Sequence, residues 1–145
     1  MFLDASAVVA VLTREEEAEA LLAKIAGSKE PIHYSSVTMF EAVIGISRKT
    51  AISIHGDQRP TPPELIAQAQ GDVEEFMRSI GAVEVAFPPG LHGVALEVAR
   101  TYGRFVGHPA RLNFGDCFSY AAARTLQSPL LFVGNDFSRT DIEVA

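Results

Sequence analysis

Short apolar runs alternate with helical patterns along this chain, and this alternation limits its fold more than any other feature. The apolar runs cover 1–3, 31–35, 82–87 and 129–133, and 142–144 is a candidate fifth. Helical spacing of apolar residues marks 6–12, 15–26, 37–49, 62–80, 91–102 and about 116–126, with loops over 51–63 and 103–113. Helices that connect parallel strands cover both faces of their sheet. We therefore predict a three-layer α/β/α sandwich with a four- to five-stranded parallel sheet.

The length and composition predict one folded domain over residues 1–145. The chain has 145 residues, of which 48% are hydrophobic and 21% charged. No apolar run approaches the ~20 residues of a membrane helix, and 7–12 is a poor signal peptide. Cys117 has no second cysteine to pair with and lies on an apolar helix face, where we expect it to be buried. A cytoplasmic protein is the expectation.

The net charge of −6 argues against a protein that binds nucleic acid through a generally basic face. Two stretches without acidic residues depart from this average, 98–115 and 42–56. Their basic residues are Arg100, Arg104, His108 and Arg111 in the first stretch, and Arg48 and Lys49 in the second. These stretches are either local positive surfaces or ordinary solvated helix ends and a loop.

Acidic residues follow the predicted strands at points far apart in the chain. Asp4 ends the first strand, Glu41 lies early in the helix after the second, Asp116 begins the helix before the fourth, and Asp136 follows the fourth. The carboxyl ends of parallel strands meet at one edge of a sheet, where ligands bind. Carboxylates without His or Cys partners suit Mg²⁺ or Mn²⁺. The pattern therefore predicts a divalent-metal site.

Each acid also has a purely structural interpretation. Asp4, Asp116 and Asp136 are good helix caps, and Thr38 to Glu41 has the spacing of a capping box. Caps need not converge, however, and converging carboxylates repel one another unless a cation lies between them.

Four segments resemble the motifs of PIN-domain ribonucleases, specifically the VapC-type toxins of bacterial toxin–antitoxin pairs. These segments are 2–7 (FLDASA), 35–42 (SSVTMFEA), 108–121 (HPARLNFGDCFSYA) and 130–137 (LLFVGNDF), so the resemblance covers essentially the whole chain. It implies a PIN-like fold, Mg²⁺-dependent endoribonuclease activity, an antitoxin that blocks the site, and a homodimer.

The resemblance also implies roles for individual residues. Asp4 and Asp116 are expected to hold the principal Mg²⁺, with Glu41 and Asp136 completing the site directly or through water. Substrate contacts are expected from Ser6, Asn113 and Arg111, and less strongly from Arg104. Many family members have a Thr-x-Asp step at the end of the fourth strand, where this chain has Phe132-Val133-Gly134. Asn135 or Asp141 is therefore an alternative contributor of the last ligand.

Three other functions compete with this one. A haloacid-dehalogenase-like phosphatase needs a second Asp where this chain has Ser6, and a response-regulator receiver needs a lysine after the final strands. A non-catalytic PIN-like module that binds RNA or protein remains the alternative.

Overall fold

The computed structural model describes residues 1–145 and contains four strands, six α-helices and two short 3₁₀-helices. Their order is β1 (Phe2–Leu3), α1 (Ala5–Leu12), α2 (Ala18–Gly27), β2 (His33–Tyr34), α3 (Ser36–His55), α4 (Pro63–Ser79), β3 (Val83–Glu84), α5 (Leu91–Tyr102), η1 (Arg104–Val106), α6 (Phe114–Thr125), β4 (Leu130–Leu131) and η2 (Phe137–Arg139). None of the helices combines the length and apolar character needed to cross a membrane.

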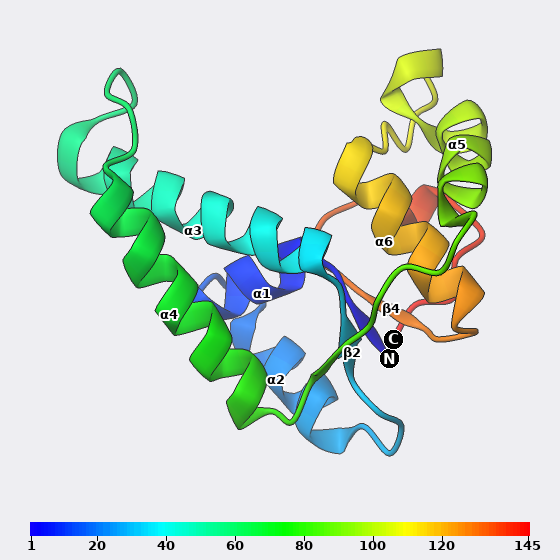
Figure 1. Ribbon diagram of the computed structural model, residues 1–145, viewed down its shortest axis with the longest axis horizontal. Coiled ribbons are helices and arrows are strands. Elements are labelled where there is room, and N and C mark those ends of the chain that lie inside the picture. Colours follow the sequence, from blue (N-terminus) through cyan, green and yellow to red (C-terminus); the bar gives the residue numbers. More distant parts are fainter.

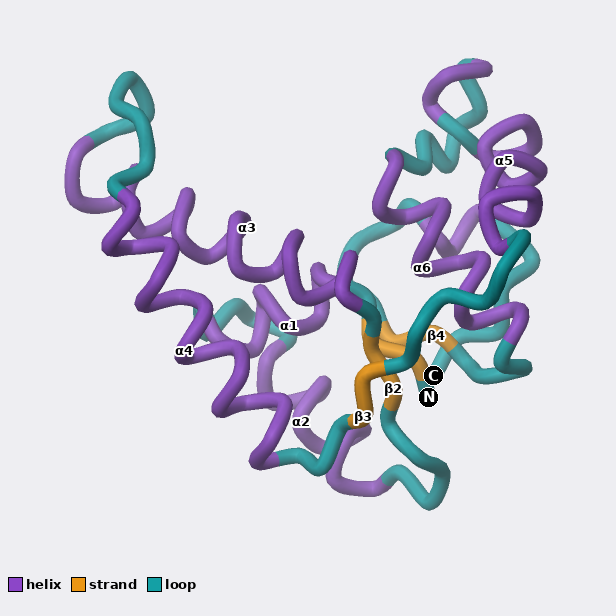
Figure 2. The backbone as a smooth tube through the Cα atoms, in the orientation of Figure 1, coloured by secondary structure: helices purple, strands orange, loops and turns teal.

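The four strands form one parallel sheet in the order β3-β2-β1-β4 (Figure 2). Phe2 of β1 pairs with both His33 and Leu130, so β1 is a central strand with a neighbour on each side. Val144 adds a single parallel bridge to Leu130 beyond β4, which is all that remains of the candidate fifth strand. The predicted parallel α/β fold is confirmed.

Alternating side chains on β1 and β4 divide the protein into two hydrophobic cores. Leu3 and Leu131 pack with residues of α1, α2, α3 and α4 on one face of the sheet. Phe2 and Leu130 pack with residues of α5 and α6 on the other. Figure 1 shows these two groups of helices on opposite sides of the strands. The sheet is thus the middle of three layers.

Each strand is shorter than the apolar run that predicted it. β1 ends at Leu3 because Asp4 is the N-cap of α1, and β2 ends at Tyr34 because Ser35 is the N-cap of α3. A residue whose side chain caps a helix turns the chain out of the sheet at that point. The caps therefore bring the helix N-termini directly to the carboxyl ends of the strands.

Several helix boundaries differ from the prediction, among them the start of α2 at Ala18 rather than at residue 15, whereas α5 spans the predicted residues. α3 continues to His55 and ends at Gly56, whose φ of 80° suits glycine, so the loop before α4 is shorter than expected. α6 begins at Phe114 rather than near Asp116, because Asn113 is its N-cap. This earlier start places Asp116 inside the first turn of α6.

Candidate active site

Asp4 is buried at the carboxyl end of β1, with 3% of its surface exposed. Its Oδ2 accepts hydrogen bonds from the backbone N–H of Ser6 (2.9 Å) and from the Ser6 hydroxyl (2.6 Å). Its Oδ1 is buried and has no hydrogen-bond partner. The interpretation of Asp4 as a helix cap is thus correct for one oxygen, and the other is left free to bind a cation.

Ser6 links the ends of two adjacent strands. Its hydroxyl donates to Asp4 Oδ2 and accepts a hydrogen bond from the backbone N–H of Val133 (3.0 Å), just after β4. The only proton of this hydroxyl is already used. In this arrangement Ser6 orients Asp4, and the substrate contact expected of it stays a prediction.

Glu41 lies on α3, beyond the residues that cap this helix. The capping box joins Ser35 and Thr38, so the alternative interpretation of Glu41 as part of a capping box is wrong. The Thr38 hydroxyl also donates to the carbonyl of Leu3 (3.2 Å), which attaches the start of α3 to the end of β1. Burial, and then the charges of Asp4 and Asp116, raise the pKa of Glu41 to about 7.

Asp116 is the third residue of α6 and forms a reciprocal capping box with Asn113. The backbone N–H of Asn113 donates to Asp116 Oδ2 (2.7 Å), and that of Asp116 donates to Asn113 Oδ1 (3.1 Å). Burial is the main cause that raises the pKa of Asp116 to about 6. The hydrogen bond from Asn113 opposes this rise, Asp4 and Asp136 add to it, and Arg104 opposes it. Asn113 therefore orients the acid, and the substrate contact expected of it stays a prediction.

Gly115 is a residue of the site that the sequence pattern did not single out. A Cβ atom built on Gly115 would overlap the carboxylate of Glu41. The absence of a side chain therefore lets Glu41 of α3 lie directly against the first turn of α6. In the sequence, its position next to Asp116 was the signal that could have indicated this role.

Asp136 is exposed on the loop after β4, immediately before η2, and caps no helix with its side chain. Its charge contributes to the raised pKa of Asp116, which places it on the same edge of the sheet. Asn135 is also exposed there, and its carbonyl accepts a hydrogen bond from Ser138 (2.7 Å).

Asp141, the other alternative ligand, is bound elsewhere. Its Oδ1 accepts hydrogen bonds from the hydroxyls of Tyr102 (2.8 Å) and Tyr120. These bonds lower the pKa of Asp141, with the bond from Tyr120 the larger cause. Asp141 thus attaches the C-terminal segment to α5 and α6.

The two arginines considered for substrate binding are both exposed. Arg104 is close enough to Asp116 for its charge to lower the pKa of that carboxyl. Arg111 lies in the loop before α6 with a left-handed φ of 54°. Of the two, only Arg104 is among the causes that shift the pKa of Asp116.

The acids are chemically suited to a hard divalent cation, although their side chains do not form a complete coordination site. The charges of Asp4 and Asp116 help to raise the pKa of Glu41, and those of Asp4 and Asp136 help to raise the pKa of Asp116. No three His, Cys, Asp or Glu side chains, however, meet in a geometry that could hold a metal ion. The unpartnered Asp4 Oδ1 and the two raised pKa values show a group of oxygens that lacks positive charge.

Comparisons with known proteins agree with this arrangement. The model of the PIN domain family matches residues 1–143. A VapC ribonuclease of Rhizobium meliloti is 36% identical over 141 residues, which cover 97% of this chain and 98% of that protein. Ribonuclease VapC42 of Mycobacterium tuberculosis is 34% identical over 145 residues, covering 100% and 98%.

The fold is also similar to a solved structure. The crystal structure of Mycobacterium tuberculosis VapC20, described as a sarcin-ricin loop cleaving toxin, superimposes with a TM-score of 0.65 at 16% identity and covers 99% of this chain and 97% of that one. The chain therefore belongs to the PIN-domain family, among its VapC ribonucleases. The predicted family, fold class and ribonuclease class of enzyme are confirmed.

Proposed function

We propose that this protein is a Mg²⁺-dependent endoribonuclease and the toxin of a type II toxin–antitoxin pair. The observation that carries the proposal is the buried, unpartnered Oδ1 of Asp4 beside Glu41 and Asp116, whose pKa values are both raised. Carboxylates held together in this way are stabilised by a divalent cation. The full-length similarity to VapC ribonucleases supports RNA as the substrate.

Each residue of the site has a distinct part in this proposal. Asp4 and Asp116 hold the principal Mg²⁺, or Mn²⁺, while Glu41 and Asp136 complete the site directly or through water. Such an ion lowers the pKa of bound water and neutralises charge on the leaving oxygen of a phosphodiester.

The remaining parts of the site orient the acids and the substrate. Ser6 and Asn113 fix the orientation of Asp4 and Asp116 through their hydrogen bonds. Arg104 and Arg111 are exposed cations available to backbone phosphates of the RNA.

The proposed biological setting is a cytoplasmic homodimer with a cognate antitoxin that blocks the acidic site. Membrane binding is not part of the proposal. The setting is testable by searching the neighbouring reading frames for a small DNA-binding protein and coexpressing it, because a true antitoxin would copurify and suppress cleavage.

The decisive experiment is cleavage of total RNA with Mg²⁺, with Mn²⁺ and with EDTA. We expect cleavage with either metal, none with EDTA, and none with folded Asp116→Asn. Full activity of Asp116→Asn, or activity in EDTA, would contradict the proposed site. Absence of both cleavage and Mn²⁺ binding in the wild-type protein would instead support a non-catalytic PIN-like module.

A further inference from the structure

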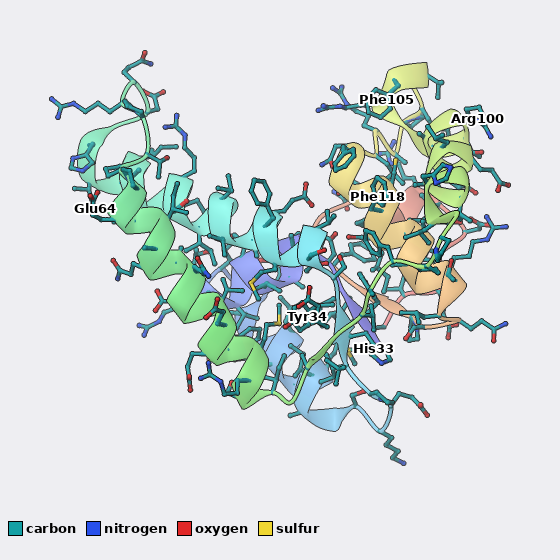
Figure 3. All side chains as sticks on the ribbon, viewed as in Figure 1. His33, Tyr34, Glu64, Arg100, Phe105 and Phe118 are labelled. Carbon is teal, nitrogen blue, oxygen red and sulfur yellow. The ribbon has the colours of Figure 1, made fainter.

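An apolar groove lies between α5, η1 and the start of α6. It is next to the acidic edge, the edge of the sheet that carries Asp4, Glu41 and Asp116. It has a volume of about 500 Å³, and Leu96, Phe105, Phe114 and Phe118 are among the side chains that line it. Figure 3 labels Phe105 on η1, Arg100 on α5 and Phe118 on α6, which together mark its extent. The acids of the candidate active site are not part of its lining.

The groove exposes large side chains that a monomeric protein normally buries. Phe105 is 63% exposed and Phe114 is 61% exposed. Leu96 and Val106 beside them are 55% and 56% exposed. A contiguous set of this kind marks a surface that binds another molecule.

The aromatic rings are arranged as a supported platform. Phe118 stacks on Phe87, with ring centroids 5.4 Å apart, and contacts Phe114 at 4.9 Å with a tilt of 50°. The packing of Phe118 on both sides fixes the floor of the groove. Phe105 and Phe114 retain open ring surface above it.

The rim of the groove is positively charged although the protein is acidic overall. Arg100 lines the groove, and the guanidinium of Arg104 lies 5.6 Å from the centroid of the Phe105 ring. No acidic residue occurs between Val98 and Gly115. This rim favours a negatively charged occupant over a neutral one.

The groove and the acids share the first turn of α6. Phe114 and Cys117 line the groove, and Asp116 stands between them in the chain. An α-helix rises ~1.5 Å per residue, so these positions lie within one turn of each other. Side chains two residues apart point to different sides of a helix, so the link between the two regions is Arg104, whose charge acts on Asp116 and whose guanidinium lies over the Phe105 ring.

We propose that this groove binds unpaired bases of the RNA substrate, which stack on Phe105 and Phe114 while Arg100 and Arg104 contact the neighbouring phosphates. Unpaired bases stack on aromatic rings and Arg planes, and duplex bases do not present these faces. The inference rests on the proposed ribonuclease function and adds to it a preference for single-stranded RNA. A protein surface is the competing occupant, but the position of Arg104 between Asp116 and Phe105 and the arginines at the rim favour the substrate.

The test measures binding separately from cleavage, in the Asp116→Asn background. A fluorescein-labelled single-stranded RNA of mixed sequence is titrated, and its anisotropy gives the Kd. Phe105→Ala and Phe114→Ala are each expected to weaken binding by about 5-fold or more. The matched control is Ile54→Ala, whose side chain is 60% exposed near the end of α3, and its Kd should not change.

Two substitutions of Phe105 distinguish stacking from simple apolar contact. Phe105→Trp retains a flat ring and should keep the affinity, whereas Phe105→Leu retains an apolar side chain without a ring and should lose it. Binding to the same RNA annealed to its complement should not respond to either change. Circular dichroism verifies that the variants are folded.

Three results would overturn the inference. The first is an unchanged Kd in the Phe105→Ala and Phe114→Ala variants. The second is retention of full affinity by Phe105→Leu. The third is that Phe105→Ala and Phe114→Ala abolish self-association, measured by light scattering, without changing the affinity for RNA. This result would assign the groove to a second copy of the chain. In each case cleavage by the wild-type enzyme would still stand, whereas absence of that cleavage would reject the proposed function itself.

Discussion

Asp4 and Asp116 each place one carboxylate oxygen in a helix cap and leave the other without a hydrogen bond, whereas Asp141 shares one oxygen between two phenol hydroxyls. The pKa values of Asp116 and Asp141 consequently shift in opposite directions. Burial and neighbouring acids raise the pKa of Asp116, and the tyrosine hydroxyls lower the pKa of Asp141. The same type of side chain is therefore available as a cation ligand at Asp116 and is a structural anchor at Asp141.

The hydrogen-bond partners, rather than the residue type, separate these two uses of aspartate. At the acidic edge, folding brings negative charges together and leaves a buried oxygen unpartnered, which costs stability. At the C-terminal anchor, Asp141 Oδ1 and the hydroxyls of Tyr102 and Tyr120 satisfy one another. Matched substitutions at the two places test whether they differ in this way.

The largest difference is expected between Asp4→Asn and Asp141→Asn. Asn is as good an N-cap as Asp, so Asp4→Asn should stay folded while RNA cleavage falls by about 100-fold or more, because several kcal/mol of transition-state stabilisation depend on the ion. Asp141→Asn should retain cleavage and lose about 1 kcal/mol of stability with its charge-assisted hydrogen bonds. Initial rates on a fluorogenic RNA and urea unfolding measure the two effects. Equal loss of activity in both variants would contradict the distinction.

Gly115→Ala should reduce activity with little effect on stability. The new Cβ atom displaces the flexible end of Glu41, and Ala favours a helix over Gly by up to about 1 kcal/mol. A displaced carboxylate costs catalysis about 10-fold or more. We expect lower kcat/KM with an unfolding midpoint no lower than that of the wild type. Wild-type kcat/KM would show that the contact between Glu41 and Gly115 has no catalytic role.

Without metal, the protein should lose stability as the pH rises. The pKa values of Glu41 and Asp116 are raised to about 7 and about 6 from 4.5 and 3.8, so the folded state holds these protons more tightly than the unfolded state. The contribution of these two groups to the free energy of unfolding is therefore largest at or below the pKa values of the unfolded state. It is lost as the pH rises through the folded-state values of about 6 and about 7. Because these groups are partly exposed, the expected difference between pH 5.5 and pH 8 is roughly 1–2 kcal/mol.

Thermal unfolding in EDTA at these two pH values measures the difference. Glu41→Gln should reduce the pH dependence, and Mg²⁺ should restore the stability of the wild type at pH 8. A rise in stability with pH over this interval would contradict the repulsion among the acids.

The smallest effect is expected at the tyrosine anchor. Tyr120 is buried and Tyr102 is partly exposed, and both donate to Asp141. Tyr120→Phe should lower the free energy of unfolding by about 1 kcal/mol, and Tyr102→Phe by less, with RNA cleavage unchanged. A loss of cleavage comparable to that of Asp4→Asn would mean that this anchor also positions the catalytic acids.

The sequence predicted the parts of the protein that depend on local pattern. Helical spacing marked α5 at its observed bounds, and the alternation of strands and helices predicted the parallel sheet. The positions of Asp4 and Glu41 relative to the strands predicted that they would share one edge. These predictions succeeded because apolar periodicity and chain connectivity limit how such elements can be buried together.

The tertiary structure alone decided which groups remain unsatisfied. The free Oδ1 of Asp4, the contact between Glu41 and Gly115, and the capture of Asp141 by Tyr102 and Tyr120 all join residues without a shared local pattern. Burial, hydrogen bonding and the distances between charges arise only when the helices pack on the sheet. The order of strands and helices thus indicated where the acids could meet, and packing set which of their oxygens were left for a cation.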